Sequence, residues 1–372
     1  MSAQKIYSGE TPHKKRFGVG HSQGGRPQMG TICKLCPRSI EKIFLGVYTL
    51  RYYPPGRSRL RPVRRAKERG RKSLSFYIVS DSSCDLGLEG VRRLGVGMVS
   101  FYVALGDEVY HREERDIATR DFYQKMADLP GVFPKTSMPT MEDYLEAFRP
   151  AAARGEEILC LCINRPYSGS YQSACTAAQE LAEEFPGARV RVMDSRCVTV
   201  LQGLLVEEAA GLRDRGRSLE EAVSALEGIR DTGRIFFTTN DLEYLHHGGR
   251  IGRAAATTGS LLKVKPLIGY EKGELVTDGI AQGRKKSLVK VRELFFRYLE
   301  REQIDLGQYR LATGFGLDRE EHREFAQAVY QGLLDRGHDR PEVLEPRQIG
   351  VTIGVHTGPT PLGVGLLRRA EG

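Results

Sequence analysis

Short apolar runs alternate with helical patterns from residue 76 onward. The runs Phe76–Val79 and Ile158–Ile163 have the length and continuous apolar character of strands that are buried on both faces. A helical pattern follows at Ser170–Phe185, and another short strand, Val190–Met193, precedes a helical stretch at Thr199–Arg215. This order of strands and helices predicts an α/β domain, Rossmann-like in its parallel sheet.

The elements that follow do not alternate strictly. After a helical stretch at Ser218–Arg230, helices are expected at Arg284–Leu299 and Glu320–Leu334. Such a mixture predicts a smaller α+β domain packed on the first, so we expect one domain at residues 75–230 and a second at 231–368. The remaining expected elements are strands at Ile235–Phe237, Leu267–Tyr270, Leu275–Ile280, Tyr309–Thr313 and Val351–Val355, an apolar run at Val99–Leu105, and helices at Phe122–Ala127 and Met141–Ala153.

The first 75 residues have a different composition. They are rich in Gly, Pro and Arg, show no sustained period, and carry 18 Lys and Arg against 3 Asp and Glu. We therefore predict a disordered basic extension at residues 1–74. The rest of the chain is mildly acidic, with 38 basic against 44 acidic residues, so nucleic-acid binding is expected only if this extension provides it.

Composition also bears on the compartment. No window approaches the roughly 20 apolar residues of a membrane-spanning helix, and the basic N-terminus lacks the apolar run of a secretory signal. The seven cysteines are odd in number, and several lie inside apolar runs, which favours reduced thiols over a disulfide framework. We expect a cytoplasmic protein.

Several motifs that suggest catalysis or metal binding lack the context they need. Ser22 lies in a G-x-S-x-G sequence, but no buried strand precedes it and Pro27 follows closely. Cys33 and Cys36 have the spacing of only half a zinc site, and the adjacent pair His246-His247 would diverge on a helix. These spacings predict no metal site. No phosphate-binding glycine motif follows a strand in the folded region, so no cofactor is expected either.

The most informative sequence is Ser168-Gly169-Ser170, between a buried strand and the start of a helix. A small turn of this kind exposes backbone N–H groups at the positive end of a helix and attracts an anion, although a serine here is also a common N-cap. Two other hydroxyl-rich turns, Lys135–Thr140 and Val355–Pro359, add hydroxyl groups and the imidazole of His356. Together these groups could hydrogen-bond a carboxylate.

The stretch from about Phe76 to Arg368 resembles the DegV family. The resemblance rests on six motifs in family order: Ser80–Leu86, Lys135–Thr140, Ser168–Ala174, Val192–Ser195, Leu245–Ile251 and His356–Pro359. It implies a Rossmann-like domain and a smaller α+β domain, with one fatty acid in an apolar tunnel between them. It further implies that Thr136, Ser168 and His356 hold the carboxylate. Ser137 and Ser170 stand close by in sequence and are further candidates.

The same resemblance implies a partner. Bacterial members of this kind resemble the acyl-carrying subunit of fatty-acid kinase, in which a separate ATP-binding subunit phosphorylates the presented carboxylate. The chain itself would then be a lipid-binding protein and not an enzyme. Arg250, Arg284 and Lys285 are the residues that the resemblance offers for docking, although a solvated basic face is an equally good interpretation.

Two other functions stay open. A stand-alone hydrolase would use Ser22 or Ser168 as nucleophile, with His356 as base and Asp81 or Asp194 as the acid that orients it. A nucleic-acid-binding protein would act through residues 1–75, and its binding would be sensitive to salt.

Overall fold

A computed structural model describes residues 76–106, 109–240, 242–252, 264–338 and 346–371. The predicted extension at 1–74 therefore lies outside the described residues, as do Ser22, Cys33 and Cys36. The described residues belong to one compact unit. It contains a four-stranded sheet, a six-stranded sheet and a small three-stranded sheet.

The four-stranded sheet is parallel throughout, as the strand–helix order predicts. Its strand order is β2-β1-β6-β7. Helices α3 and α4 cover one face around the buried Tyr144 and Phe148, and α5 packs on the other face with Leu201 and Leu205. The elements are β1 (Tyr77–Asp81), β2 (Val96–Val99), β6 (Ile158–Cys162), β7 (Val190–Asp194), α1 (Gly87–Leu94), α3 (Met141–Ala152), α4 (Ser170–Glu184), α5 (Thr199–Asp214) and α6 (Leu219–Ile229).

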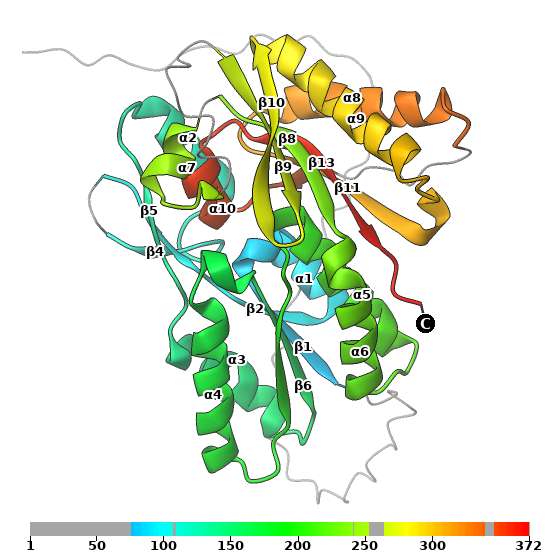
Figure 1. Ribbon diagram of the computed structural model, residues 1–372. Coiled ribbons are helices and arrows are strands. Elements are labelled where there is room, and N and C mark those ends of the chain that lie inside the picture. The colour runs from blue at the N-terminus through cyan, green and yellow to red at the C-terminus, as the bar shows by residue number, and fades with distance from the viewer. Residues whose placement is uncertain (1–75, 107–108, 241, 253–263, 339–345, 372) are drawn as a thin grey trace, which may run out of the picture. The chain divides into compact units, whose positions relative to one another are not determined.

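The six-stranded sheet has the order β10-β9-β8-β13-β11-β12 and is antiparallel except for the pair β11–β12. Helices α8 and α9 cover its outer face, whereas α5 packs against β11 and β13 on the inner face (Figure 1). Helix α5 thus lies between the two sheets. The elements are β8 (Arg234–Thr238), β9 (Val264–Glu271), β10 (Glu274–Gln282), β11 (Tyr309–Phe315), β12 (Pro346–Gln348), β13 (Leu362–Arg368), α8 (Arg284–Arg301) and α9 (Arg319–Leu334).

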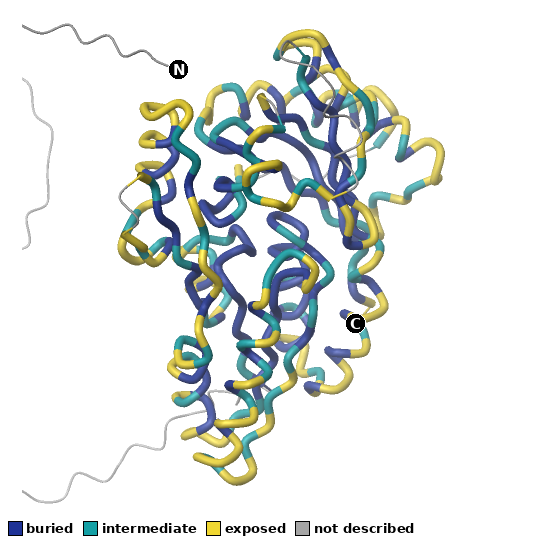
Figure 2. Tube along the Cα trace, turned by 60° about the vertical axis from the view of Figure 1, so that its left-hand side comes forward, coloured by how far each residue is buried: buried dark blue, intermediate teal, exposed yellow. Residues whose placement is uncertain are grey.

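The third group of elements is small. The sheet β4-β3-β5 lies beside α2 and α10, and its core contains Val103, Phe122 and Val355. The elements are β3 (Tyr102–Ala104), β4 (His111–Arg112), β5 (Lys135–Ser137), α2 (Thr119–Asp128), α7 (Glu243–His247), α10 (Val351–Thr357) and the 3₁₀ turns η1 (Ser82–Cys84), η2 (Arg165–Tyr167), η3 (Arg230–Thr232) and η5 (Leu306–Gln308). The buried parts of the chain lie in the inner elements, and the exposed parts in the outer helices and loops (Figure 2).

The strand predicted at Val351–Val355 is wrong, because this segment is helix α10. Its β-branched residues favour a strand when they are considered locally. Two carboxylates remote in sequence decide otherwise: Asp85 Oδ1 accepts from the N–H of Gly350 at 2.9 Å, and Glu113 Oε1 from the N–H of Thr352 at 2.9 Å. These bonds satisfy free donors at the start of the helix.

Two further differences concern β structure. The run Val99–Leu105 is not one strand, because β2 ends at Val99 in the parallel sheet and β3 begins at Tyr102 in the small sheet. Strand β13, the central partner of β8 and β11, is absent from the sequence-based assignment. Its glycines at 363 and 365 weaken the strand signal. The domain division at residue 230 stays a prediction, although the parallel sheet ends before this point and the six-stranded sheet begins after it.

Candidate functional site

An apolar cavity of about 310 Å³ lies between the parallel sheet and the six-stranded sheet. The first turn of α5 lines it with Val198 and Val200, and Ile163 at the end of β6 contributes from the same side. This volume is at the lower end of the range of small-molecule sites. The lining is mainly apolar, which suits a hydrocarbon ligand.

One wall of the cavity crosses five neighbouring strands of the six-stranded sheet. Leu275 of β10, Tyr270 of β9, Phe237 of β8, Gly363 of β13 and Gly314 of β11 all line it. With roughly 4.8 Å between neighbouring strands, this wall is about 19 Å long. The cavity is therefore elongated across the strands.

Polar groups gather at one part of this cavity. Thr136 and Ser137 of β5, Ser168 after η2, and His356 in the last turn of α10 all line it. The Oγ1 atom of Thr136 lies 3.3 Å from Nε2 of His356. Four of the five residues expected at a carboxylate site thus line one cavity.

Ser170, the fifth, does not line the cavity. Its side chain is fully buried, donates to Asp81 Oδ2 at 2.8 Å and lies 2.6 Å from the hydroxyl of Tyr144. Its backbone N–H donates to Oγ of Ser168 at 3.2 Å. The N-cap of α4 is Gly169, so the hydroxyl of Ser168 accepts from the first helical residue while facing the cavity.

His356 has a neutral imidazole at neutral pH. Burial, reinforced by the positive charge of Arg250, lowers its pKa to about 4. Among the described residues, its Nδ1 atom has no hydrogen-bond partner, and the ring lies so close to Gly248 that a methyl group there would overlap with it. The ring can therefore offer one N–H to a ligand without carrying a charge.

Arg250 is the cation at this end of the cavity. Its Nη1 donates to the carbonyl of Gly248 at 2.7 Å, and its Nε to the carbonyl of Tyr167 at 3.3 Å. The residue is exposed and also lines the cavity. No carboxylate among the described residues forms an ion pair with it, so its charge is available to an anion.

The buried carboxylate of Asp81 accepts several hydrogen bonds next to the polar end of the cavity. It accepts from the N–H of Ile163 at 2.9 Å, from Gln202 Nε2 at 2.8 Å and from the hydroxyl of Ser83 at 2.5 Å, besides Ser170. Burial raises its pKa. The sequence places Asp81 in a motif but gives no sign of this positioning role.

Two more buried carboxylates position His356 from a distance. Asp85 and Glu113 bond the start of α10, as described above, and Glu113 also accepts from the hydroxyls of Ser82 at 2.6 Å and Thr352 at 2.7 Å. Burial raises the pKa of both carboxyls. These bonds hold the start of the seven-residue helix whose last turn carries His356.

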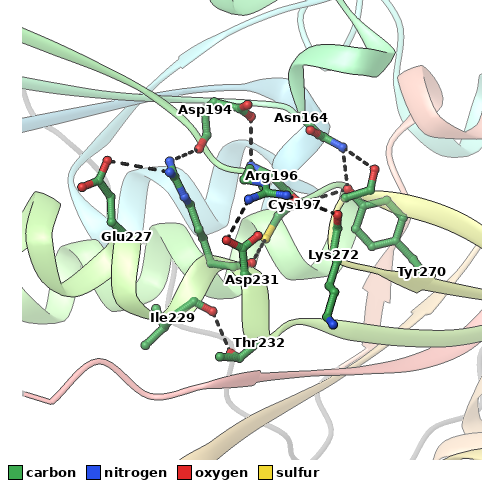
Figure 3. A network of polar contacts seen from close by, with 12 residues as sticks. Asn164, Asp194, Arg196, Cys197, Glu227, Ile229, Asp231, Thr232, Tyr270 and Lys272 are labelled. Atoms are coloured by element: carbon green, nitrogen blue, oxygen red, sulfur yellow. Dashed lines mark hydrogen bonds and ion pairs between the residues drawn. The ribbon is translucent and has the colours of Figure 1, made fainter.

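Asp194 belongs to a different network. Its Oδ1 accepts from the N–H of Arg196 at 2.9 Å and its carbonyl from Nη1 of Arg230 at 2.9 Å, while Arg196 pairs with Asp231 at 2.9 Å (Figure 3). Through Tyr270, whose hydroxyl donates to the carbonyl of Arg196 at 3.0 Å, this network joins the end of β7 to β9.

The proposed serine-hydrolase arrangement is not assembled. Asp81 bonds serines, a glutamine and a backbone amide, Asp194 bonds backbone amides, and neither contacts His356. Without an acid on Nδ1, the described residues offer Ser168 no oriented base. The alternative that uses Ser22 lies outside the described residues.

The two other residues expected at a docking surface lie at the start of α8. Arg284 is bound by Glu321, with 2.6 Å between Nη2 and Oε2, and its side chain is largely buried, whereas Lys285 is exposed. Arg284 is therefore committed to joining α8 to α9. Docking through these residues stays a prediction.

Within the described ranges, no group of His, Cys, Asp and Glu is placed to hold a metal ion. No helix in the same ranges is long and apolar enough to span a bilayer.

Comparison with known proteins identifies the family. The family model described as an uncharacterised protein of the DegV family matches residues 75–369. This chain belongs to the DegV family. A DegV domain-containing protein of Deinococcus radiodurans is 32% identical over 295 residues, which cover 79% of this chain and 98% of the relative.

Solved structures of similar proteins share the fold. A stearic-acid-binding protein from Eubacterium ventriosum is 36% identical, with a TM-score of 0.74 over 79% of this chain and 99% of that one. A DegV family protein from Thermus thermophilus, described for its fatty acid binding, is 32% identical, with a TM-score of 0.68 over 79% and 99%. Both proteins are described as binding fatty acids.

Proposed function

We propose that this chain binds one long-chain fatty acid in the cavity, with the carboxylate at Thr136, Ser168 and His356. The observation that carries the proposal is an elongated apolar cavity with these polar groups and Arg250 in one part of its lining. Hydroxyls and a neutral imidazole hydrogen-bond a carboxylate, and the guanidinium of Arg250 adds an opposite charge. Ser137 is a further donor on the same strand.

The length of the cavity supports a long acyl chain. One leaflet of a bilayer, which holds a single acyl chain, is about 15 Å thick, or half of the hydrocarbon core. The wall of about 19 Å that crosses five strands has a similar length. Burial of each methylene group contributes about 0.8 kcal/mol to the binding free energy. The acyl chain therefore provides most of the affinity, and the polar end of the cavity sets the orientation of the ligand.

The kinase partner is the second part of the proposal. We propose that the protein acts in the cytoplasm and presents the carboxylate to an ATP-binding fatty-acid kinase subunit, which would form the acyl phosphate. Arg250, at the cavity and exposed, is the best placed of the three docking candidates, followed by the exposed Lys285.

Titration of delipidated protein with a fluorescent long-chain fatty acid tests the ligand. We expect saturation at one site, with competition by unlabelled stearic acid and much weaker competition by the saturated alcohol of the same chain length at equal concentration. Equal competition by the alcohol would contradict a carboxylate site.

Reconstitution with an ATP-binding kinase subunit tests the partner. We expect Lys285→Glu to raise the protein concentration needed for half-maximal ATP consumption without changing fatty-acid affinity. Arg301→Glu is the control, because Arg301 lies 16 residues further along α8, about 24 Å away. Equal effects of the two variants would argue against docking at the start of α8.

A further inference from the structure

Two glycines leave the middle of the inner sheet face without side chains. Gly363 of β13 pairs in register with Gly314 of β11 and, on its other side, with Phe237 of β8, and all three line the cavity. In the next row on the same face, Gly365 pairs with Ala312 and Ile235. These small residues allow the first turn of α5 to pack closely on β13 and β11, because a Cβ at Gly365 would lie 3.2 Å from Cγ2 of Val200.

The glycines cannot be exchanged freely. A Cβ at Gly363 would lie 2.5 Å from the Cβ of Phe237, which is closer than such atoms approach in proteins. A Cβ at Gly314 would lie 3.0 Å from Cγ1 of Val200 and 3.1 Å from Cγ1 of Ile349. The position over Gly314 is therefore filled by two buried aliphatic side chains, which also line the cavity.

The apolar space ends immediately beyond these side chains. Arg347 of β12 is the register partner of Gly314 on the far side, and its guanidinium donates to Glu207 of α5 at 2.9 Å. Glu207 also pairs with Arg310 at 3.1 Å, and its side chain is 8% exposed. An acyl chain that extended past Gly314 would have to displace this largely buried ion-pair network, which is costly.

We propose that Val200 and Ile349 form the stop for the methyl end of the ligand and so set the longest acyl chain that this protein accepts. The part of the cavity lined by Gly363 is the last part of the path to that stop. This inference rests on the proposed fatty-acid function and adds to it the residues that determine chain length. Each added methylene group strengthens binding about fourfold until the chain reaches the stop, after which binding weakens.

The test measures the affinities of saturated fatty acids of increasing length for the unmodified protein, three cavity variants and one control variant. Val200→Ala and Ile349→Ala open the stop, and we expect the preferred length to increase by about two methylene groups. Gly314→Ala adds a methyl group at the stop, so we expect the preferred length to fall by about one. The opposite directions keep the test informative if one of the variants folds poorly.

The matched control is Val329→Ala. Val329 is a fully buried valine on α9, in the core on the other face of the same sheet, so its truncation loses the same methyl groups without opening the cavity. We expect its length profile to match that of the unmodified protein.

The results distinguish a failure of the proposed fatty-acid function from a failure of the proposed chain-length stop. If the unmodified protein binds no fatty acid of any length, the proposed function is wrong. If it binds them but Val200→Ala and Ile349→Ala leave the preferred length unchanged, or shift it no more than Val329→Ala does, the stop lies elsewhere and this inference is overturned.

Discussion

The Oγ1 atom of Thr136 and the Nε2 atom of His356 lie 3.3 Å apart, although 220 positions separate them in the chain. Thr136 comes from the small sheet that follows β2, and His356 from a helix that precedes the last strand. Their contact brings the two halves of the polar end together. Because the fold itself holds these two groups in contact, little binding energy is needed to order them around a carboxylate.

Thr136→Val tests the role of the hydroxyl. The change keeps the shape of the side chain and removes one hydrogen bond to a charged group, which is worth about 1.5–3 kcal/mol. We expect fatty-acid affinity to fall roughly 10- to 100-fold, as measured by equilibrium titration. The matched control is Thr313→Val, because the hydroxyl of Thr313 also contacts a histidine, His322, at 2.8 Å, yet neither residue lines the cavity. Equal losses of affinity in the two variants would contradict a direct contact.

Gly248→Ala should displace the imidazole. A methyl group at this position would overlap with Nδ1 of His356, and its other near neighbour is the carbonyl of Tyr244 at 3.1 Å. We expect weaker fatty-acid binding, of the size caused by His356→Ala, with a smaller effect on the melting temperature. The control is Gly228→Ala in helix α6, where a methyl group meets nothing within 4 Å and is expected to stabilise the helix by up to about 1 kcal/mol. Full affinity in Gly248→Ala would show that the position of the ring does not matter.

Arg250 should control the protonation of His356. Its positive charge is the second cause, after burial, of a pKa near 4, so Arg250→Ala should raise that pKa toward its ordinary value of 6.5 without reaching it. Addition of a fatty acid should also raise the pKa of His356, because a carboxylate favours the charged imidazole. NMR titration of the imidazole resonances measures both effects, with Arg301→Ala as a control that removes a remote charge. If neither Arg250→Ala nor the fatty acid changes the pKa of His356, neither the guanidinium nor the ligand carboxylate lies near the ring.

Glu113 should make stability depend on pH. Burial raises its pKa in the folded state above the ordinary value of 4.5, so the folded state binds a proton more tightly than the unfolded state. The resulting contribution to stability is fully present below the ordinary pKa and is lost as the pH rises through the folded-state pKa. In Glu113→Gln, an amide can still accept from the N–H of Thr352, and the fall in unfolding free energy from pH 4 upward should be less steep. The slope that remains should come from Asp81 and Asp85, because burial raises the pKa of these two carboxyls as well.

Urea unfolding at several pH values measures this slope. Glu302→Gln, at an exposed carboxylate, is the control and should leave the slope unchanged. A slope in Glu113→Gln equal to that of the unmodified protein would mean that Glu113 does not titrate in this range.

Much of the architecture follows from the sequence, because buried parallel strands produce continuous apolar runs. The runs at Phe76–Val79 and Ile158–Ile163 correspond to β1 and β6, which lie side by side in the parallel sheet. Helix α10 could not be predicted in the same way. Its formation depends on Asp85 and Glu113, which are 265 and 239 positions away from the amides that they bond.

The candidate site was predictable only in part, because local patterns show turns but not contacts between distant parts of the chain. Small hydroxyl-rich turns mark Thr136, Ser168 and His356 in the sequence, and all three line the cavity. Ser170 follows Ser168 by two residues, and the sequence gives no sign that its hydroxyl points to Asp81 and Tyr144 instead of the cavity. The roles of Gly248 and Arg250 depend on a contact with a helix about 100 residues later, and local patterns do not report such contacts.

Organic extraction and mass spectrometry of the purified protein test the central claim most directly, with Thr136→Val/His356→Ala prepared in parallel and Thr313→Val as the folded control. We expect a long-chain fatty acid at close to one per chain in the unmodified protein and in the control, and a strong depletion in the double variant. A folded, lipid-free protein that takes up no added fatty acid would contradict it.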